Sequence, residues 1–154
     1  MNLTSLLSED QILDDMRATG HFEALEELVD HLDTSALLHG VSREVVLEAI
    51  RNREDQTSTG IGAGVAIPHA FVPGLESVIT VIGRSHEGID FESIDNVPVN
   101  LVVLFIVPED QYHTHLQTLA AIAKMLSDGE TRARLIDAPD SSSILRTVEE
   151  RCTA

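Results

Sequence analysis

One stretch of the sequence, Val99 to Val107, contains almost no polar residues and leads into Pro108. A strand with apolar residues on both faces must be covered on both sides, as the central strand of a layered α/β sheet is. The longest apolar run, Leu101 to Val107, is far shorter than the ~20 residues that a helix needs to cross a bilayer. We therefore expect a buried central strand here and no membrane insertion.

Helical periodicity lies on both sides of this strand. Ser8 and Gln11 have the spacing of a capping box, and apolar residues recur at intervals of three and four from Phe22 to Leu32. Ser42 is placed to cap a further helix. The predicted helices cover about residues 9–17, 22–32, 43–54, 111–126, 131–136 and 141–151.

Between these two groups of predicted helices, the sequence pattern indicates extended strands. The pairs Pro73-Gly74 and Asp95-Asn96 mark turns between short apolar segments. The predicted strands cover residues 64–67, 77–85, 88–91 and 99–107. Helices at both ends of a strand-rich middle predict one α/β domain over residues 1–154, a mixed β-sheet flanked by helices on both sides.

Composition narrows the class of protein. With 154 residues, of which 43% are hydrophobic and 23% charged, the chain has the size and composition of one globular domain. The formal net charge of -16, with ten thinly spread Lys and Arg residues, argues against nucleic-acid binding. An acidic start without an apolar signal core predicts a cytoplasmic protein. The acidic N-terminal third is either a solvated helical face or an adaptation to a salty host.

Three alternate glycines precede a Pro-His pair in the stretch Thr59 to Ala70. Their spacing fits neither a dinucleotide fingerprint nor a P-loop. Glycines permit the close backbone approaches of a ligand-binding loop, although a tight turn that leads into a strand would also explain them. Pro68 fixes the backbone just before His69, and imidazole is a suitable nucleophile near pH 7. His69 is thus a candidate carrier of a phosphoryl group, with a structural histidine as the alternative.

The segment from Tyr112 to Leu116 supplies two further histidines at the start of a predicted helix. His115 shares the face of the apolar residues Leu119, Ile122, Ala123 and Leu126. His113 points about 200° away from that face at ordinary helical rotation. Helical phase therefore selects His115 for the site and predicts that His113 lies on the surface.

The first turn of that helix offers unpaired backbone N–H groups and the positive end of the helix dipole, which suit a phosphate. Together with His69 and His115 it would suit phosphoryl transfer, and Arg53 is the basic residue nearest in sequence to the glycine loop. A metal site formed by His69, His113 and His115 is the competing interpretation. An H-x-H pair lies on different sides of a helix, however, and the sequence has no cysteine cluster or H-E-x-x-H.

Several of these motifs together resemble the enzyme IIA domain of the bacterial sugar phosphotransferase system, of the fructose, mannitol and nitrogen-regulatory type. The similarity extends over almost the whole chain, and S-T-G-I-G followed by A-I-P-H is a specific signal. The motifs are Arg53-Glu54, Thr57-Ser58-Thr59-Gly60-Ile61-Gly62, Val65-Ala66-Ile67-Pro68-His69 and His115-Leu116, with the apolar pairs Leu119-Ala120 and Ile122-Ala123.

This resemblance implies a role for particular residues. His69 would accept a phosphoryl group from the phosphohistidine carrier protein HPr and pass it to a IIB domain. His115 would be the second active-site histidine, and Arg53 would be the basic residue near the site. The implied fold is a mixed sheet with helices on both sides, and we expect no cofactor and no metal.

The sequence departs from the family pattern at three positions. Ala63 stands where many relatives have Asn, Gln56 replaces a small or apolar residue, and His113 is an additional imidazole. Two functions remain compatible with the resemblance. The protein is either a regulator whose phosphorylation state controls binding to target proteins, or a transport component that serves a sugar-specific IIB. A domain without a linked IIB or IIC favours regulation and leaves transport open.

Overall fold

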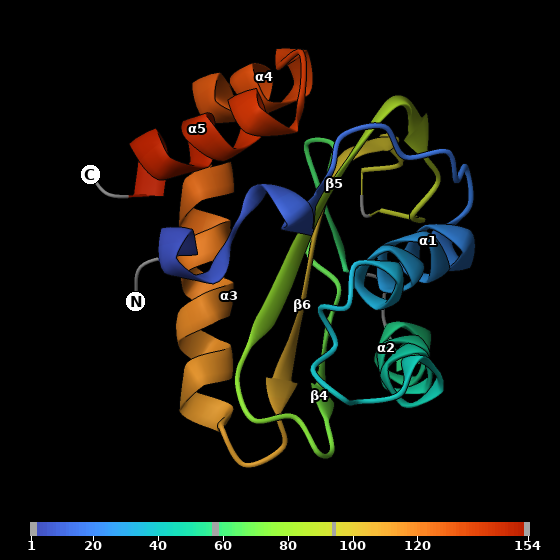
Figure 1. The fold of residues 1–154 in the computed structure, drawn as a ribbon. Coiled ribbons are helices and arrows are strands. Elements are labelled where there is room, and N and C mark those ends of the chain that lie inside the picture. Colours follow the sequence, from blue (N-terminus) through green and yellow to red (C-terminus); the bar gives the residue numbers. More distant parts are fainter. Residues whose placement is uncertain (1–2, 57–58, 94, 153–154) are drawn as a thin grey trace.

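The computed structural model describes residues 3–56, 59–93 and 95–152, and of Gln56 and Cys152 the backbone only. Over these residues a sheet lies between two layers of helices (Figure 1). One face is covered by the helices α1 (His21–Thr34) and α2 (Arg43–Gln56). The other face is covered by α3 (Tyr112–Leu126), α4 (Gly129–Asp137) and α5 (Ser141–Cys152). Two 3-10 turns, η1 (Leu3–Leu6) and η2 (Glu9–Gln11), begin the described chain.

The sheet is mixed, as predicted. Its described strands are β1 (Ile12–Leu13), β2 (Gly60–Gly62), β3 (Val65–Ala66), β4 (His69–Val72), β5 (Ile79–Ile89) and β6 (Val99–Pro108). They follow the order β1-β5-β6-β3-β2, and β4 also pairs with β6. β5 is antiparallel to β6, whereas β3 and β4 run parallel to β6. The α/β architecture with helices on both sides is confirmed.

β6 is the central strand that the apolar run predicted. Its side chains alternate between two cores, because successive residues of a strand point to opposite faces. Val102 and Leu104 pack on the side of α1 and α2, and Val103 and Phe105 pack on the side of α3 and α5. Both cores need apolar side chains from the same strand, which explains the absence of any polar alternation in this segment.

The prediction of a helix over about residues 9–17 is wrong. The capping box is present, with the backbone N–H of Ser8 donating to Gln11 Oε1 at 2.9 Å, but only the short turn η2 follows it. The chain then becomes extended, and Ile12 pairs with Ile82 of β5 and is buried. Pairing with a distant strand therefore overrides the local helical signal. The other predicted helices are confirmed as α1 to α5.

The strands near the glycine loop are more numerous than predicted. β2 and β4 were not expected, and the two segments predicted at residues 77–85 and 88–91 form the single strand β5. An irregularity in its pairing with β6 falls between Arg84 and Ile89, where the sequence suggested a break. The unexpected strand β4 is the one that carries the candidate residue His69, which is its first residue.

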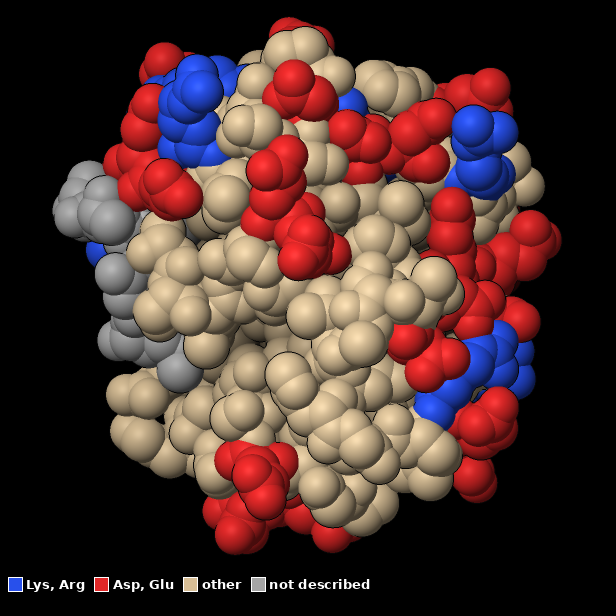
Figure 2. Space-filling model, in the orientation of Figure 1, with Lys and Arg blue, Asp and Glu red and all other residues tan. Residues whose placement is uncertain are grey.

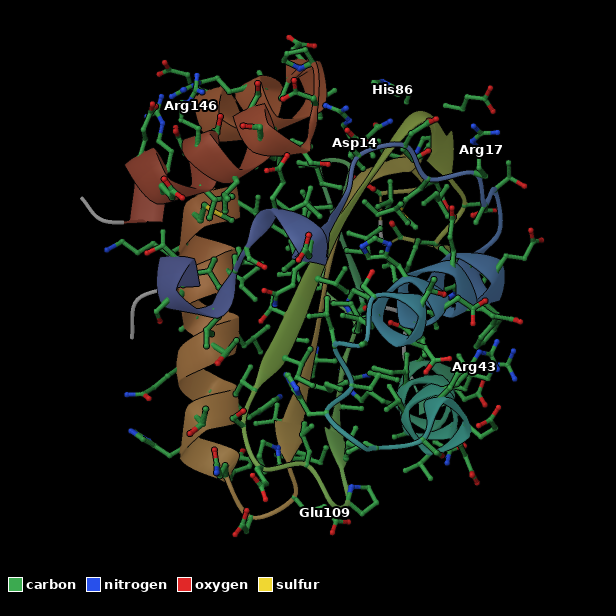
Figure 3. All side chains as sticks on the ribbon, viewed as in Figure 1. Asp14, Arg17, Arg43, His86, Glu109 and Arg146 are labelled. Carbon is green, nitrogen blue, oxygen red and sulfur yellow. The ribbon has the colours of Figure 1, made fainter. Side chains whose placement is uncertain are left out.

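Most charged side chains of the protein are carboxylates, with 26 Asp and Glu residues against 10 Lys and Arg. Figure 2 shows acidic side chains around much of the visible face, with an uncharged region across its middle. Basic residues are often engaged by neighbouring acids: Arg43, labelled in Figure 3, donates to Asp30 and, at 3.2 Å, to Glu26, which joins α2 to α1. Among the described residues, every helix is too short or too polar to cross a bilayer.

Candidate functional site

His69 lies at the beginning of β4 and is 9% exposed. Its ring stacks on Phe105, the residue paired with it on β6, with ring centroids 5.1 Å apart. Its Nδ1 lies 2.7 Å from the carbonyl oxygen of Ile67. A carbonyl oxygen can only accept, so Nδ1 carries the proton and the Nε2 of a neutral ring is left with its lone pair.

The backbone around His69 is held by its neighbours on both sides. The carbonyl of Pro68 accepts the N–H of Phe105 at 3.0 Å, and the N–H of Ile67 donates to the carbonyl of Thr59 at 3.0 Å. Pro68 itself has a fixed φ and no N–H to satisfy. The Ile67 carbonyl, which accepts the hydrogen bond from the His69 ring, therefore lies in a segment that backbone hydrogen bonds hold in place.

The surroundings of His69 favour its neutral form. Burial lowers the pKa of His69 below its ordinary value of 6.5, and the positive charge of Arg53 and the neighbouring His115 lower it further. The hydrogen bond to Ile67 acts in the opposite direction. A histidine with a lowered pKa is neutral at pH 7, which is the form that can act as a nucleophile.

His115, in the first turn of α3, brings a second imidazole to the same place. Its ring centroid lies 5.0 Å from that of His69 and 4.9 Å from that of Phe71. Burial, followed by the charge of Arg53, lowers the pKa of His115. Its Nδ1 is buried and has no hydrogen-bond partner among the described residues. Helical phase predicted this placement, and it also predicted correctly that His113 is exposed.

The structure brings Arg53 to the two histidines. All three line one pocket of about 710 Å³, together with Ala49, Asn52, Ala70, Phe71 and Leu119. Arg53 lies near the end of α2, and the histidines come from β4 and α3, so the pocket forms where the two helical layers meet an edge of the sheet. Two imidazoles and a guanidinium in one pocket provide a setting for an anion.

The described part of the chain does not supply the set of ligands that a metal site would require. His113 is exposed, whereas His115 on the same helix faces the pocket. Within residues 3–56, 59–93 and 95–152, no three His, Cys, Asp or Glu side chains are grouped so that they could hold a metal ion.

Residues 5–151 match the family described as "Phosphoenolpyruvate-dependent sugar phosphotransferase system, EIIA 2". The chain belongs to this EIIA family. The resemblance noted from the sequence motifs is confirmed, and it extends over nearly the whole chain.

Relatives of this EIIA domain come from two branches. It is 34% identical over 150 residues to the "PTS system fructose-specific EIIABC component" of Bacillus subtilis (strain 168). The match spans 97% of this chain but only 23% of that longer protein. It is 36% identical over 144 residues to a "Nitrogen regulatory protein" of Bradyrhizobium diazoefficiens, covering 94% of the chain and 92% of that protein. The crystal structure of the nitrogen regulatory protein IIA-Ntr from Neisseria meningitidis has a TM-score of 0.86 and 27% identity, and covers 95% of this chain and 98% of its own.

The glycine loop of this EIIA domain is held by a residue that sequence reasoning placed only in a turn. Asp95 Oδ2 accepts the backbone N–H of Ala63 at 2.9 Å, and its other oxygen accepts the N–H of Val97 at 3.1 Å. These two bonds lower the pKa of Asp95. Gly60 is required by a close approach, because a Cβ at this position would lie 2.3 Å from Ser93 Oγ. Gln56 departs from the family pattern in sequence, but its side chain lies outside the described part of the structure.

Two further residues near the site were not predicted to have a role. Glu54 follows Arg53 and is 4% exposed, and its carboxylate contacts His21 from α1 and Thr59 at the start of the glycine loop. The motif Arg53-Glu54 was visible in the sequence, but His21 lies 33 positions earlier. No periodic pattern connects residues at such a separation, so only the fold reveals the pair.

Proposed function

We propose that this EIIA domain is a phosphocarrier in which Nε2 of His69 accepts a phosphoryl group from a phosphohistidine of an HPr-like carrier and passes it to a IIB domain. The observation that carries the proposal is the 2.7 Å hydrogen bond from His69 Nδ1 to the Ile67 carbonyl. It places the proton on Nδ1 and leaves the lone pair on Nε2. The proposed location is the cytoplasm, where the carrier protein is available.

The transfer needs no proton acceptor. The lone pair of His69 Nε2 forms a bond to phosphorus while the P–N bond of the donor breaks, and that electron pair returns to the donor ring. A donor ring whose other nitrogen is protonated leaves as neutral imidazole, and the ring of His69 becomes a phosphorylated imidazolium that keeps its Nδ1 proton. The Ile67 carbonyl, which accepts a hydrogen bond from this Nδ1–H, stabilises the new positive charge.

Neighbouring groups suit the charge of the moving phosphoryl group. Its negative oxygens need donors that are already in place, because phosphoryl transfer depends mainly on positioning and electrostatics. Arg53 and His115 line the pocket with His69 and supply N–H donors. His115 belongs to the first turn of α3, so the positive end of that helix dipole lies near the pocket.

The similarity to nitrogen regulatory proteins supports a regulatory output for this phosphorylation. That branch matches the chain at 36% identity over 92% of the relative's length, and the IIA-Ntr structure has a TM-score of 0.86. In this role the phosphorylation state of His69 would control binding to target proteins. The second candidate is sugar transport, which is supported by 34% identity to the fructose-specific EIIABC component.

Phosphorylation can be tested with purified components. The protein is incubated with phosphoenolpyruvate, enzyme I and HPr, and its intact mass is measured. We expect a gain of one phosphate that is acid-labile and base-stable, lost in His69→Ala and retained in the matched control His113→Ala. Undiminished phosphorylation of a folded His69→Ala protein would overturn the assignment. Transfer onward to IIB proteins of the same cell then distinguishes a transport component from a regulator.

A further inference from the structure

A buried carboxylate lies behind the pocket and takes no part in the transfer described above. Glu54 belongs to the last part of α2, and its side chain is 1% exposed. Its oxygens accept the N–H of Thr59 at 3.1 and 3.2 Å and also accept the Thr59 hydroxyl. A buried carboxylate is costly unless several donors compensate its charge, so this cluster is a specific arrangement.

Among the described residues, the remaining donor to Glu54 is His21, the first residue of α1. Its Nε2 lies 2.7 Å from Glu54 Oε2, and because a carboxylate accepts, the imidazole donates. The ring of His21 is itself fixed by packing, with centroids 4.9 Å from Phe22 and 4.4 Å from Phe91. Glu54 is thus clamped between a packed imidazole on one side and the glycine loop on the other.

A continuous series of hydrogen bonds leads from this clamp to the nucleophile. Glu54 holds the N–H of Thr59, and the carbonyl of Thr59 accepts the N–H of Ile67 at 3.0 Å. The carbonyl of Ile67 then accepts Nδ1–H of His69 at 2.7 Å. Glu54 therefore reaches the carbonyl that determines which nitrogen of His69 is protonated through the backbone hydrogen bond between Thr59 and Ile67.

We propose that Glu54, clamped by His21, is a positioning residue for phosphoryl transfer, which holds His69 with Nε2 unprotonated and directed to the pocket. The inference rests on the function proposed above. Glu54 holds His69 through Thr59 and Ile67, its charge also raises the pKa of His69, and it does not line the pocket. It also adjoins Arg53, so one clamp fixes both the nucleophile and the end of α2 that carries the guanidinium.

Substitutions at Glu54 separate a positioning role from a purely structural one. In Glu54→Ala the loop loses its anchor, whereas Glu54→Gln retains an oxygen that can accept the Thr59 N–H. His21→Phe keeps a ring against Phe91 but cannot donate to Glu54. Asp55→Ala is the matched control, because Asp55 is the next residue of α2 and is exposed.

Two measurements are made on each folded variant. The first is the tautomer of His69 in the unphosphorylated protein, from long-range ¹H–¹⁵N correlations of its ring. The second is the rate of phosphoryl transfer from phospho-HPr, resolved into kcat and KM. Folding is checked by circular dichroism and urea unfolding, so that each rate refers to native protein.

We expect the wild-type protein and Asp55→Ala to show His69 as the Nδ1–H tautomer alone. Glu54→Ala should show a mixture of tautomers and lose about tenfold or more in kcat, since small displacements of reacting groups are costly. KM for phospho-HPr should stay within about twofold, because the contact surface is unchanged. Glu54→Gln should recover most of the loss, and His21→Phe should fall between the two.

An unchanged tautomer and kcat in folded Glu54→Ala would overturn the proposal, as would an effect confined to KM. If every variant at Glu54 and His21 unfolded, the pair would be a structural element of the core and the proposal would be wrong. The tautomer is observed without any transfer. A wild-type protein that HPr does not phosphorylate would therefore contradict the proposed function, whatever Glu54 does to His69.

Discussion

The imidazole of His69 lies nearly parallel to the ring of Phe105, with an interplanar angle of 11°. The register of β4 on β6 makes these two residues direct neighbours, so strand pairing places the His69 ring against the Phe105 ring. Phe105 is fully buried, and it also lies 5.9 Å from His115 by ring centroids. One aromatic side chain of the core thus supports both imidazoles of the site.

Replacing Phe105 should therefore affect transfer more than stability. Phe105→Leu keeps an apolar side chain of similar volume, and we expect it to lower the free energy of unfolding by about 1 kcal/mol. It should also slow phosphorylation of His69, because the flat surface behind the ring is lost. Leu104→Val, on the opposite face of β6, is the control: it should cost about 1 kcal/mol and leave transfer unchanged. Urea unfolding and the rate of phosphorylation measure both effects.

The lowered pKa of His69 predicts how stability depends on pH. Between the ordinary value of 6.5 and the lowered pKa, the unfolded chain binds a proton that the folded protein does not. The free energy of unfolding therefore falls as the pH drops through this window, and His69 contributes no such slope above it. We expect His69→Gln to lose less stability than the wild-type protein over the same window, measured by urea unfolding. An NMR titration that places the pKa of His69 above 6.5 would contradict the prediction.

Ala63 adopts a left-handed backbone, with φ of 57°, in the glycine loop. This conformation is unfavourable for Ala but is tolerated by Asn and Gly. Ala63→Asn and Ala63→Gly should keep the backbone bond to Asp95 and raise the free energy of unfolding by about 0.5–1 kcal/mol. The opposite is expected for Ala133→Gly in the exposed part of α4, which should cost about 1 kcal/mol. A loss of stability at Ala63 similar to that at Ala133 would show that the loop is not strained.

Arg84 is 1% exposed, and its guanidinium donates to the carbonyls of Asp14, Leu135 and Ala138. These carbonyls belong to the segment before α1 and to the end of α4, so one side chain joins three parts of the chain. Arg84→Met should lower the free energy of unfolding by about 3 kcal/mol, since the buried carbonyls lose their donors. Arg17→Met is the control, because Arg17 is exposed and should change stability by less than about 0.5 kcal/mol. Figure 3 labels Asp14 and Arg17 on the same stretch of chain.

Features that depend on local periodicity could be predicted from the sequence. The apolar segment of β6 identified the centre of the sheet, and helical phase identified His115 as the imidazole that faces the pocket. Ile12 shows the limit of this reasoning, because its pairing with Ile82 converts an expected helix into a strand. Strand β4 was missed because four residues after a proline carry too little pattern.

The supports of the site could not be read from the sequence for a different reason. Glu54 and His21 meet across 33 positions, and Ala63 and Asp95 meet across 32. Each pair is made by the packing of separate elements, and neither residue alone has a spacing that indicates its partner. The sequence therefore indicated His69, the proposed phosphoryl acceptor, more readily than the residues that hold it.

The positive charge of Arg53 acts on both histidines of the pocket. The guanidinium lowers the pKa of His69 and of His115, so Arg53→Ala should raise both pKa values. The same change removes a cation from the pocket in which we propose that the phosphoryl group is held, and we expect transfer to slow by about 10²-fold. Arg53→Lys should restore the charge but not the planar fork that binds two phosphate oxygens, and should recover only part of the rate.

The matched control for Arg53 is Arg51→Ala on the same helix, because Arg51 pairs with Glu26 at 3.2 Å outside the pocket. It should leave both histidine pKa values and the rate of transfer unchanged. NMR titration of the two rings and rapid-quench phosphorylation measure the two effects separately. A slowed transfer without a rise in the pKa values would mean that Arg53 acts on the phosphoryl group alone. Unchanged rates in Arg53→Ala would remove it from the site.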